Sequence, residues 1–397
     1  MMKIRASFQG RRSGGFSLIE LMVSVVIGLI ALGLATRLVV SSESNKQAAM
    51  GSSDSMQNGV LALFSIEREL NQAGWGLNDP MIAGCDTVFN DTTPGGGYAM
   101  LGASRGGAAV TPLASVVISN GGTTGSDLLS INAGSSMSNA GSVGLAKPYA
   151  GGSQLVVDRV AYGFNGTATV PAGGDVIVVA PEAAGTQKCS LAMVSSSVPG
   201  ADNLLMIASG GANRFNTGSL SVGYSAPGTR VFNLGPAANL SFHTWAVSNG
   251  GFLTLRATNL AGTQTTGQAV TDNIVGLKAQ YGLDTRVGAA FTPELGMNVS
   301  TWSNTMTDAN GDGVAGSAGD YTRIAAVRVA VLARGRNPEK PNQSGVCTTT
   351  TVVPTAFNGA VVMPKAVTGD SIDWKCYRYR VFETIVPVRN SGWRPTP

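Results

Sequence analysis

Glu20 is the residue with the clearest chemical implication, because it is the one acid in an apolar run from Phe16 to about Thr36. A carboxylate inside a hydrocarbon layer costs about 2.5–3.5 kcal/mol on insertion scales, so such a residue usually has a partner and a function. Proteolysis could create that partner. A cut between Gly15 and Phe16 would expose an α-amine four residues before Glu20. Its positive charge could meet the carboxylate within one helix or between neighbouring helices.

The apolar run is long enough, as a helix, to cross a hydrocarbon layer of roughly 30 Å. Four basic residues precede it with no acid among them, namely Lys3, Arg5, Arg11 and Arg12. By the positive-inside rule this end stays in the cytoplasm and the remaining mass crosses the membrane. A secretory signal peptide is the alternative. It would predict a shorter apolar core followed by a cleavage site, and it gives no reason for Glu20.

Three stretches of the chain resemble a known family, the type IV prepilins. The strongest is GGFSLIELMVSVVIGLIALGL at residues 14–34, and ALFSIERELNQAGWGL (62–77) and RYRVFETIVPVRN (378–390) look like the PilW group of minor pilins. The resemblance implies that a prepilin peptidase cleaves after Gly15 and methylates the new N-terminus at Phe16. It also implies that Glu20, at the fifth mature position, meets the N-terminal amine of a neighbouring subunit during assembly.

This resemblance implies a non-enzymatic minor pilin that is incorporated into a type IV pilus or primes its assembly, with no cofactor required. Its implied partners are other minor and major pilins, the prepilin peptidase and the inner-membrane assembly platform. The implied location is the bacterial inner membrane with the head in the periplasm, and later the pilus and cell surface. A pseudopilin of a type II secretion system shares the N-terminal signature and is the nearest alternative. A membrane-anchored surface adhesin or hydrolase is a more distant one.

We expect an α+β fold with a cytoplasmic leader (1–15), a long transmembrane and amphipathic helix (16–75) and a β-rich, mostly antiparallel head (76–397). In the second half of the helix, the residues at helical spacing that we expect to face the sheet are Met56, Val60, Leu63, Phe64 and Leu70. Runs rich in Val, Ile and Leu predict strands in the head, at 113–119, 153–164, 175–180, 203–209, 252–258, 274–283, 324–334 and 378–388.

The four cysteines are Cys85, Cys189, Cys347 and Cys376, and none forms a C-x-x-C pair. An even count in an exported domain favours two disulfides over a zinc or redox site, and three pairings are possible. The resemblance favours Cys347–Cys376, which would close a C-terminal loop like the one that pilins commonly staple, and this leaves Cys85–Cys189.

Other catalytic and binding patterns are weak. Ser104 lies in a G-x-S-x-G match without a strong preceding strand, and His243, the only histidine, lies in a strand-like run where a structural role is favoured. The G-x-G-x-x-G match at Gly311 is crowded by acids that would repel a pyrophosphate. Without the four leader residues, 23 basic side chains balance 23 acidic ones, which argues against nucleic-acid binding.

One loop has the spacing of a calcium site. Asp308, Asn310 and Asp312 stand at positions 1, 3 and 5, with Gly313 at position 6, as at the start of an EF-hand loop. Position 12 is Gly319 instead of the bidentate Glu. The candidate Ca²⁺ ligands are therefore Asp308, Asn310, Asp312, Asp320 and the carbonyl of Val314. The alternative is a turn whose Asp and Asn side chains cap their own backbone.

Overall fold

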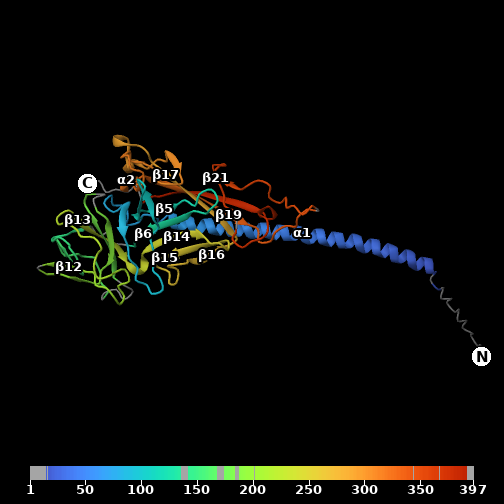
Figure 1. The fold of residues 1–397 in the computed structure, drawn as a ribbon, viewed down its shortest axis with the longest axis horizontal. Helices are drawn as coiled ribbons and strands as arrows, with labels where there is room; N and C mark the ends of the chain where they lie inside the picture. Colours follow the sequence, from blue (N-terminus) through green and yellow to red (C-terminus); the bar gives the residue numbers. More distant parts are fainter. Residues whose placement is uncertain are drawn as a thin grey trace, which may run out of the picture. The chain divides into compact units, whose positions relative to one another are not determined.

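The computed structural model describes residues 15, 17–135, 142–167, 174–183, 187–200, 202–342, 344–365 and 367–390. Residues up to Ser53 form one compact unit, and the residues from Asp54 onward form a second, which we call the head. Helix α1, Leu18–Leu70, belongs to both units, and the rest of the head is built mostly of strands (Figure 1). The expected α+β class is confirmed, whereas the predicted boundaries 1–15, 16–75 and 76–397 stay a prediction.

Two antiparallel sheets and the C-terminal part of α1 form one part of the head and share one core. The five-stranded sheet has the order β16 (Gln268–Asp272), β15 (Phe252–Ala257), β14 (Ser241–Val247), β6 (Leu128–Ala133) and β5 (Val116–Ser119). The four-stranded sheet has the order β18 (Thr301–Ser303), β17 (Ile274–Leu283), β19 (Ile324–Arg334) and β22 (Tyr379–Pro387). Every pair within these two sheets is antiparallel.

The other strands form a second group. A six-stranded sheet has the order β4 (Pro112–Leu113), β1 (Cys85–Val88), β10 (Cys189–Met193), β9 (Asp175–Pro181), β13 (Thr229–Pro236) and β7 (Val143–Gly144), in which β1 and β10 are parallel. A three-stranded sheet joins β11 (Ser196–Val198), β12 (Asn203–Met206) and β8 (Gln154–Val157). Two hairpins pair β2 (Ala103–Arg105) with β3 (Ala108–Val110), and β20 (Thr355–Ala356) with β21 (Val361–Val362).

The remaining helices are short. They are α2 (Ala318–Tyr321) and 3₁₀ turns at Ala237–Asn239, Gly288–Ala290, Pro293–Leu295 and Trp374–Cys376. Helix α1 ends at Leu70, and the turn behind it needs positive φ at Gly74 (81°) and Gly76 (71°), a conformation that residues with a Cβ seldom adopt. The Asn390 side chain donates a 3.0 Å hydrogen bond to the carbonyl of Ala73, which ties this turn to the segment after β22.

Burial on both faces explains why several strands are apolar without alternation. In β19, Val327, Val329 and Val331 face the core that contains α1, while Ala330 and Leu332 pack on the other face. Strand β9 is likewise buried along its whole length, between the core of the six-stranded sheet and the core beneath the three-stranded sheet. A strand covered on both faces loses the polar positions that an exposed face would have.

Candidate assembly surface and processing site

The N-terminal segment holds the predicted processing and assembly residues. Gly15 is exposed, Phe16 lies outside the described residues, and Glu20 lies in the first turn of α1, where a carboxylate is favourable beside the helix N-terminus. Residues Leu18–Glu43 have a mean hydropathy of 2.5 and are long enough to cross a membrane. None of them is buried within the structure, so this segment has a large apolar surface without an intramolecular partner.

Two hydroxyls in the middle of the apolar segment are satisfied locally. Ser24 donates to the carbonyl of Leu21 (2.9 Å), and Thr36 donates to the carbonyl of Gly33 (3.0 Å). Each hydroxyl therefore has an acceptor within its own helix and needs no water, which is what a hydrocarbon environment requires.

The face of α1 that packs on the sheets overlaps the predicted one only in part. Met56, Val60 and Phe64 are exposed by 51%, 51% and 61%, so their expected burial was wrong. Leu70 is buried in the core and Leu63 is partly buried against it, as predicted, and the core also contains Ala62 and Ile66, which were not predicted. The exposed set and the set of Ala62, Ile66 and Leu70 have the same spacing of four residues, and the structure buries the set that contains the small residue. We call Met56, Val60 and Phe64 the outer stripe.

The helix approaches β22 closely at Gly59, and this contact decides which face of α1 is buried. A Cβ built on Gly59 would overlap the aromatic ring of Phe382 on β22, so the helix and the strand meet where the helix has no side chain. One residue earlier, Asn58 Nδ2 donates to Asp272 Oδ1 at 2.7 Å. These two contacts attach the beginning of the head helix to the four-stranded and five-stranded sheets.

A buried acid, Glu69, attaches the end of α1 to strand β14 of the five-stranded sheet. Glu69 Oε1 lies 2.8 Å from His243 Nδ1, and Glu69 Oε2 accepts a 2.6 Å hydrogen bond from Trp245 Nε1. His243 Nε2 contacts Asn259 Oδ1 at 2.9 Å. Burial alone lowers the pKa of His243, but the hydrogen bond and charge of Glu69 more than offset this, so the pKa is raised above its usual value. The structural role predicted for His243 is therefore the one observed, and its partner Glu69 was not predicted.

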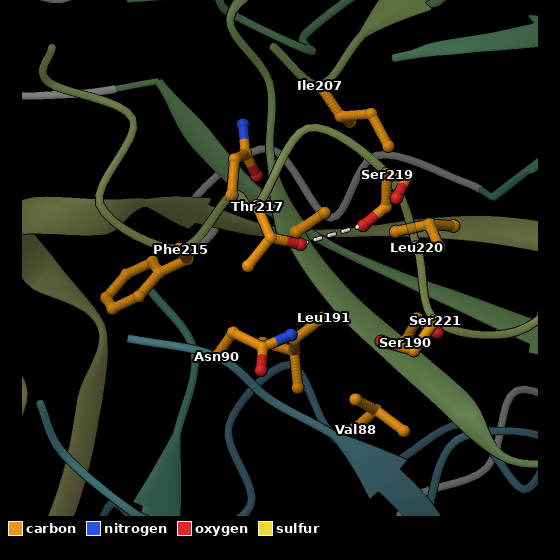
Figure 2. Close-up of a pocket in the computed structure, with 12 residues that line it drawn as sticks. Val88, Asn90, Ser190, Leu191, Ile207, Phe215, Thr217, Ser219, Leu220 and Ser221 are labelled. Carbon is orange, nitrogen blue, oxygen red and sulfur yellow. Dashed lines mark hydrogen bonds between the residues drawn. The ribbon is translucent and has the colours of Figure 1, made fainter. Parts of the chain in front are cut away.

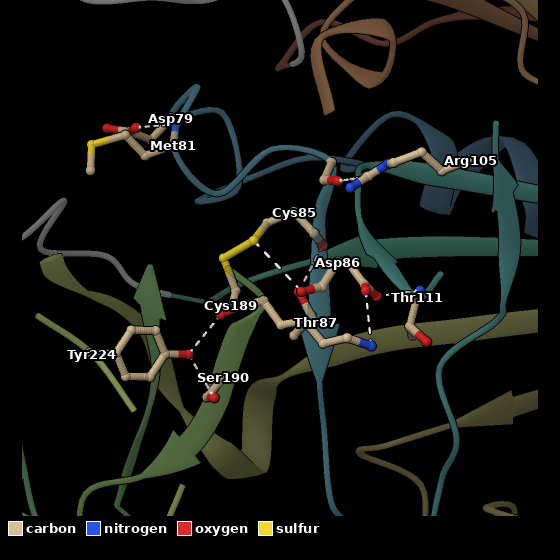
Figure 3. The surroundings of a disulfide bond; sticks show 12 residues. Asp79, Met81, Cys85, Asp86, Thr87, Arg105, Thr111, Cys189, Ser190 and Tyr224 are labelled. Carbon is tan, nitrogen blue, oxygen red and sulfur yellow. Dashed lines mark hydrogen bonds and ion pairs between the residues drawn. A yellow bond between two sulfur atoms is a disulfide. The ribbon is translucent and has the colours of Figure 1, made fainter. Parts of the chain in front are cut away.

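Both disulfides predicted with the help of the family resemblance are present. Cys85–Cys189 joins β1 to β10 in the core of the six-stranded sheet, and Cys347–Cys376 closes a loop of the C-terminal part. Figure 3 shows the first bond beside Asp86, which accepts a hydrogen bond from Thr111 N and pairs with Lys188 at 3.0 Å. The described cysteines leave no free thiol.

In the loop of the candidate calcium site, the side-chain carboxylates accept hydrogen bonds from backbone N–H groups of the same loop. Asp308 Oδ1 accepts from Gly311 N (2.8 Å) and Asp312 N (3.0 Å), and its Oδ2 accepts from Gly313 N (2.9 Å). Asp312 Oδ1 accepts from Val314 N (2.8 Å). Within the described residues, no three His, Cys, Asp or Glu side chains are grouped as a metal site. The calcium site stays a prediction, and the contacts are those expected of the alternative turn.

Within the described part of the chain, Ser104 and His243, the residues weighed above for catalysis, form no hydrogen bond with each other. Ser104 lies on β2, while both ring nitrogens of His243 contact other side chains. A small pocket lined by β1, β10 and residues 207–221 is drawn in Figure 2, where Thr217 Oγ1 donates to the carbonyl of Ser219 (3.0 Å). The described residues that line it contribute hydroxyl, amide and apolar groups and no acidic or basic side chain; they include Val88, Asn90, Ser190, Phe215, Asn216 and Ser221.

Two family models match parts of the chain. Residues 246–390 match the model described as Type IV Pilus-assembly protein W, and residues 10–36 match the Prokaryotic N-terminal methylation motif. The first match contains β17, β19 and β22, and the second contains Gly15 and Glu20. No curated protein matches the chain, and neither does a solved structure.

Proposed function

Since the chain is a PilW-like type IV pilin, we propose that it is a minor pilin, incorporated into a type IV pilus or required to prime its assembly. On this proposal a prepilin peptidase removes residues 1–15 and methylates Phe16. The head then stands in the periplasm until assembly moves it to the pilus and the cell surface. The protein acts by binding other pilins and catalyses no reaction.

The unpartnered apolar surface of α1 is the observation that carries this proposal. Leu18–Glu43 is apolar and wholly exposed, and the outer stripe adds exposed Met56, Val60 and Phe64 within the head. Single exposed apolar residues are common, but a contiguous apolar helix face marks a membrane or protein contact. Helix packing between subunits would cover both regions, and the ion pair between Glu20 and the amine of Phe16 would set the register.

Recovery of the protein in sheared pili tests the proposed function. Phe64→Glu places a charge in the outer stripe and should reduce incorporation about tenfold or more, because burying an unpaired carboxylate is costly. Leu295→Glu is the matched control, since Leu295 is 83% exposed and lies at the end of a 3₁₀ turn of the head. Both variants should keep the melting temperature and membrane insertion of the wild type. Equal recovery of the two variants would contradict the role of the outer stripe.

Two further variants test the N-terminal residues. Gly15→Leu should leave the full-length chain in the membrane, because a side chain there obstructs the backbone beside the cut, and sequencing of wild-type mature protein should begin at Phe16.

Glu20→Ala should insert as well as wild type or better, since it removes the desolvation cost, while incorporation into pili falls. A Glu20→Ala variant that enters pili normally would exclude the proposed ion pair. Recovery in secretion-system filaments instead of pili would identify the chain as a pseudopilin.

A further inference from the structure

The part of α1 that belongs to the head begins at Asp54. Strand ends and C-terminal loops surround this beginning. Asn58 contacts Asp272 at the end of β16, and Gly59 meets Phe382 near the start of β22. In the four-stranded sheet, Arg334 at the end of β19 pairs with Tyr379 at the start of β22. The two ends of the chain segment between these strands therefore lie at this end of the head (Figure 1), while the β20–β21 hairpin in its middle packs on a face of the four-stranded sheet.

This chain segment is basic, although the chain after the leader is neutral. From Arg334 to Arg380 the sequence has seven Lys and Arg residues and three Asp and Glu residues. Two of the acids are neutralised within the segment, since Asp370 pairs with Arg334 at 2.6 Å and Glu339 pairs with Arg378. In the part of the chain that the structure describes, the other five cations form no ion pair; they are Arg336, Lys340, Lys365, Lys375 and Arg380.

Apolar groups lie among these cations. The Nζ atoms of Lys365 and Lys375 lie 4.9 and 5.9 Å from the centre of the Trp374 ring, and Ile372 is 42% exposed. The disulfide Cys347–Cys376 holds the loop with Val346, which is 52% exposed, next to the turn that contains Trp374. We call this the basal surface; its residues are Arg336, Lys340, Val346, Ile372, Trp374 and Lys375.

We propose that the basal surface binds the anionic headgroups of the bilayer that holds the chain's own apolar segment. Only ten residues, 44–53, separate the candidate span, which ends at Glu43, from the head, which begins at Asp54. Ten residues span at most about 35 Å even when fully extended, so the chain length alone limits how far the start of the head can lie from the bilayer surface. The inference rests on membrane anchoring, which is part of the proposed function, and does not depend on incorporation into a pilus.

The chemistry of the basal surface favours a lipid surface over an acidic protein. Unpaired Lys and Arg side chains are attracted to anionic lipids, each contributing roughly a fivefold increase in binding. Tryptophan is enriched at the membrane interface, and exposed aliphatic groups gain by entering the boundary between headgroups and acyl chains. Binding in this way would hold the head in one orientation against the membrane until a neighbouring subunit engages α1.

Hydrogen exchange of the full-length protein in lipid nanodiscs tests the proposal. Discs of phosphatidylcholine alone are compared with discs that also contain phosphatidylglycerol, and the amides of residues 335–347 and 371–378 are followed. We expect severalfold slower exchange in the anionic discs at low salt. The protection should disappear at about 1 M salt, where the Debye length is about 3 Å. Equal exchange in the two kinds of disc would overturn the proposal.

A pair of double variants provides the matched control. Lys340→Gln with Lys375→Gln should lower the ratio of bound to free basal surface roughly 10–30-fold in anionic discs. Lys147→Gln with Lys188→Gln removes the same charge where the lysines pair with Asp202 and Asp86, and it should leave the protection unchanged. Equal effects of the two double variants would reject a local contact.

Two further outcomes separate this proposal from others. Protection that appears only when other pilins are added would show that the basal surface binds protein, and the proposal would be wrong. The Phe64→Glu variant should retain the protection in anionic discs even though its incorporation into pili is reduced. Failure of the assembly proposal and failure of the lipid proposal are therefore read from separate measurements.

Discussion

His243 Nδ1 lies 2.8 Å from Glu69 Oε1, and this pair joins the only histidine of the chain to the last turn of α1. The side chains are largely buried, with exposed fractions of 10% for His243 and 14% for Glu69. Trp245 on the same strand donates to the second carboxylate oxygen. One acid on the helix thus holds two residues of β14, and the helix cannot turn about its axis without breaking both contacts.

The first prediction concerns pH. Because the folded-state pKa of His243 lies above the usual value of 6.5, the pair stabilises the head fully below about pH 6.5, and this contribution is lost as the pH rises through the folded-state pKa. The difference in free energy of unfolding between wild type and Glu69→Gln should therefore be larger near pH 6 than near pH 9. Denaturant titrations followed by tryptophan fluorescence measure it, and parallel stability curves would contradict the prediction.

The second prediction concerns Gly59. Gly59→Ala should destabilise the head by about 1–3 kcal/mol, because the new methyl group overlaps the ring of Phe382 and the helix or the ring must move. Gly51→Ala is the control. It has open space around the new Cβ and should stabilise the helix by up to about 1 kcal/mol through helix propensity alone. Phe382→Leu should relieve most of the Gly59→Ala cost, and if it does not, the overlap is not the cause.

Much of the fold could be predicted from the sequence where both faces of an element are buried. The run 274–283 coincides with β17, and the run 324–334 coincides with β19, because strands covered on both sides are mostly apolar, here with few polar residues such as Lys278 and Arg328. In the run 153–164, by contrast, only Gln154–Val157 forms a strand. Strands such as β13 (Thr229–Pro236) were missed, because polar residues interrupt their apolar pattern.

The face of α1 could not be predicted from its spacing. Met56, Val60 and Phe64 repeat every four residues, and so do Ala62, Ile66 and Leu70, so periodicity gives two equally good faces. The choice depends on how closely the helix approaches β22, a distance that is decided by tertiary contacts at Gly59. The basal surface was also missed, although counting charges along the C-terminal part would have found its excess of basic residues.

The third prediction concerns the two disulfides. The chain-entropy model gives about 4.7 kcal/mol for a bond across 104 residues and about 3.6 kcal/mol across 29 residues. Replacing Cys85 and Cys189 by Ser should therefore lower the melting temperature more than replacing Cys347 and Cys376. The second change should act locally, increasing hydrogen exchange at the basal surface while the six-stranded sheet keeps its protection. Global loss of protection in the second variant would show that its loop supports the whole head.

The last prediction separates structure from metal binding in the loop of residues 308–320. Asp320 is fully buried, and its carboxylate accepts from the backbone N–H groups of Ala309 (2.6 Å), Asn310 (3.0 Å) and Ser317 (2.9 Å). Asp320→Ala should cost about 3 kcal/mol or more without any calcium, since each buried donor left unsatisfied costs about 1–3 kcal/mol. Asp308 is exposed, so water can replace its carboxylate and Asp308→Ala should cost less than about 1 kcal/mol.

Calcium titration of the same proteins then decides whether the loop of residues 308–320 binds calcium. Ca²⁺ prefers carboxylate and carbonyl oxygens, and the exposed Asp308 and Asp312 carboxylates retain lone pairs beyond those that accept N–H bonds. A calcium site here should have a dissociation constant on the order of 10⁻⁴–10⁻³ M, and it should raise the melting temperature of wild type but not of Asp308→Ala with Asp312→Ala. If millimolar calcium gives neither heat nor a melting shift in wild type, the loop is a backbone-capped turn, and its acids act through the N–H groups that they accept from.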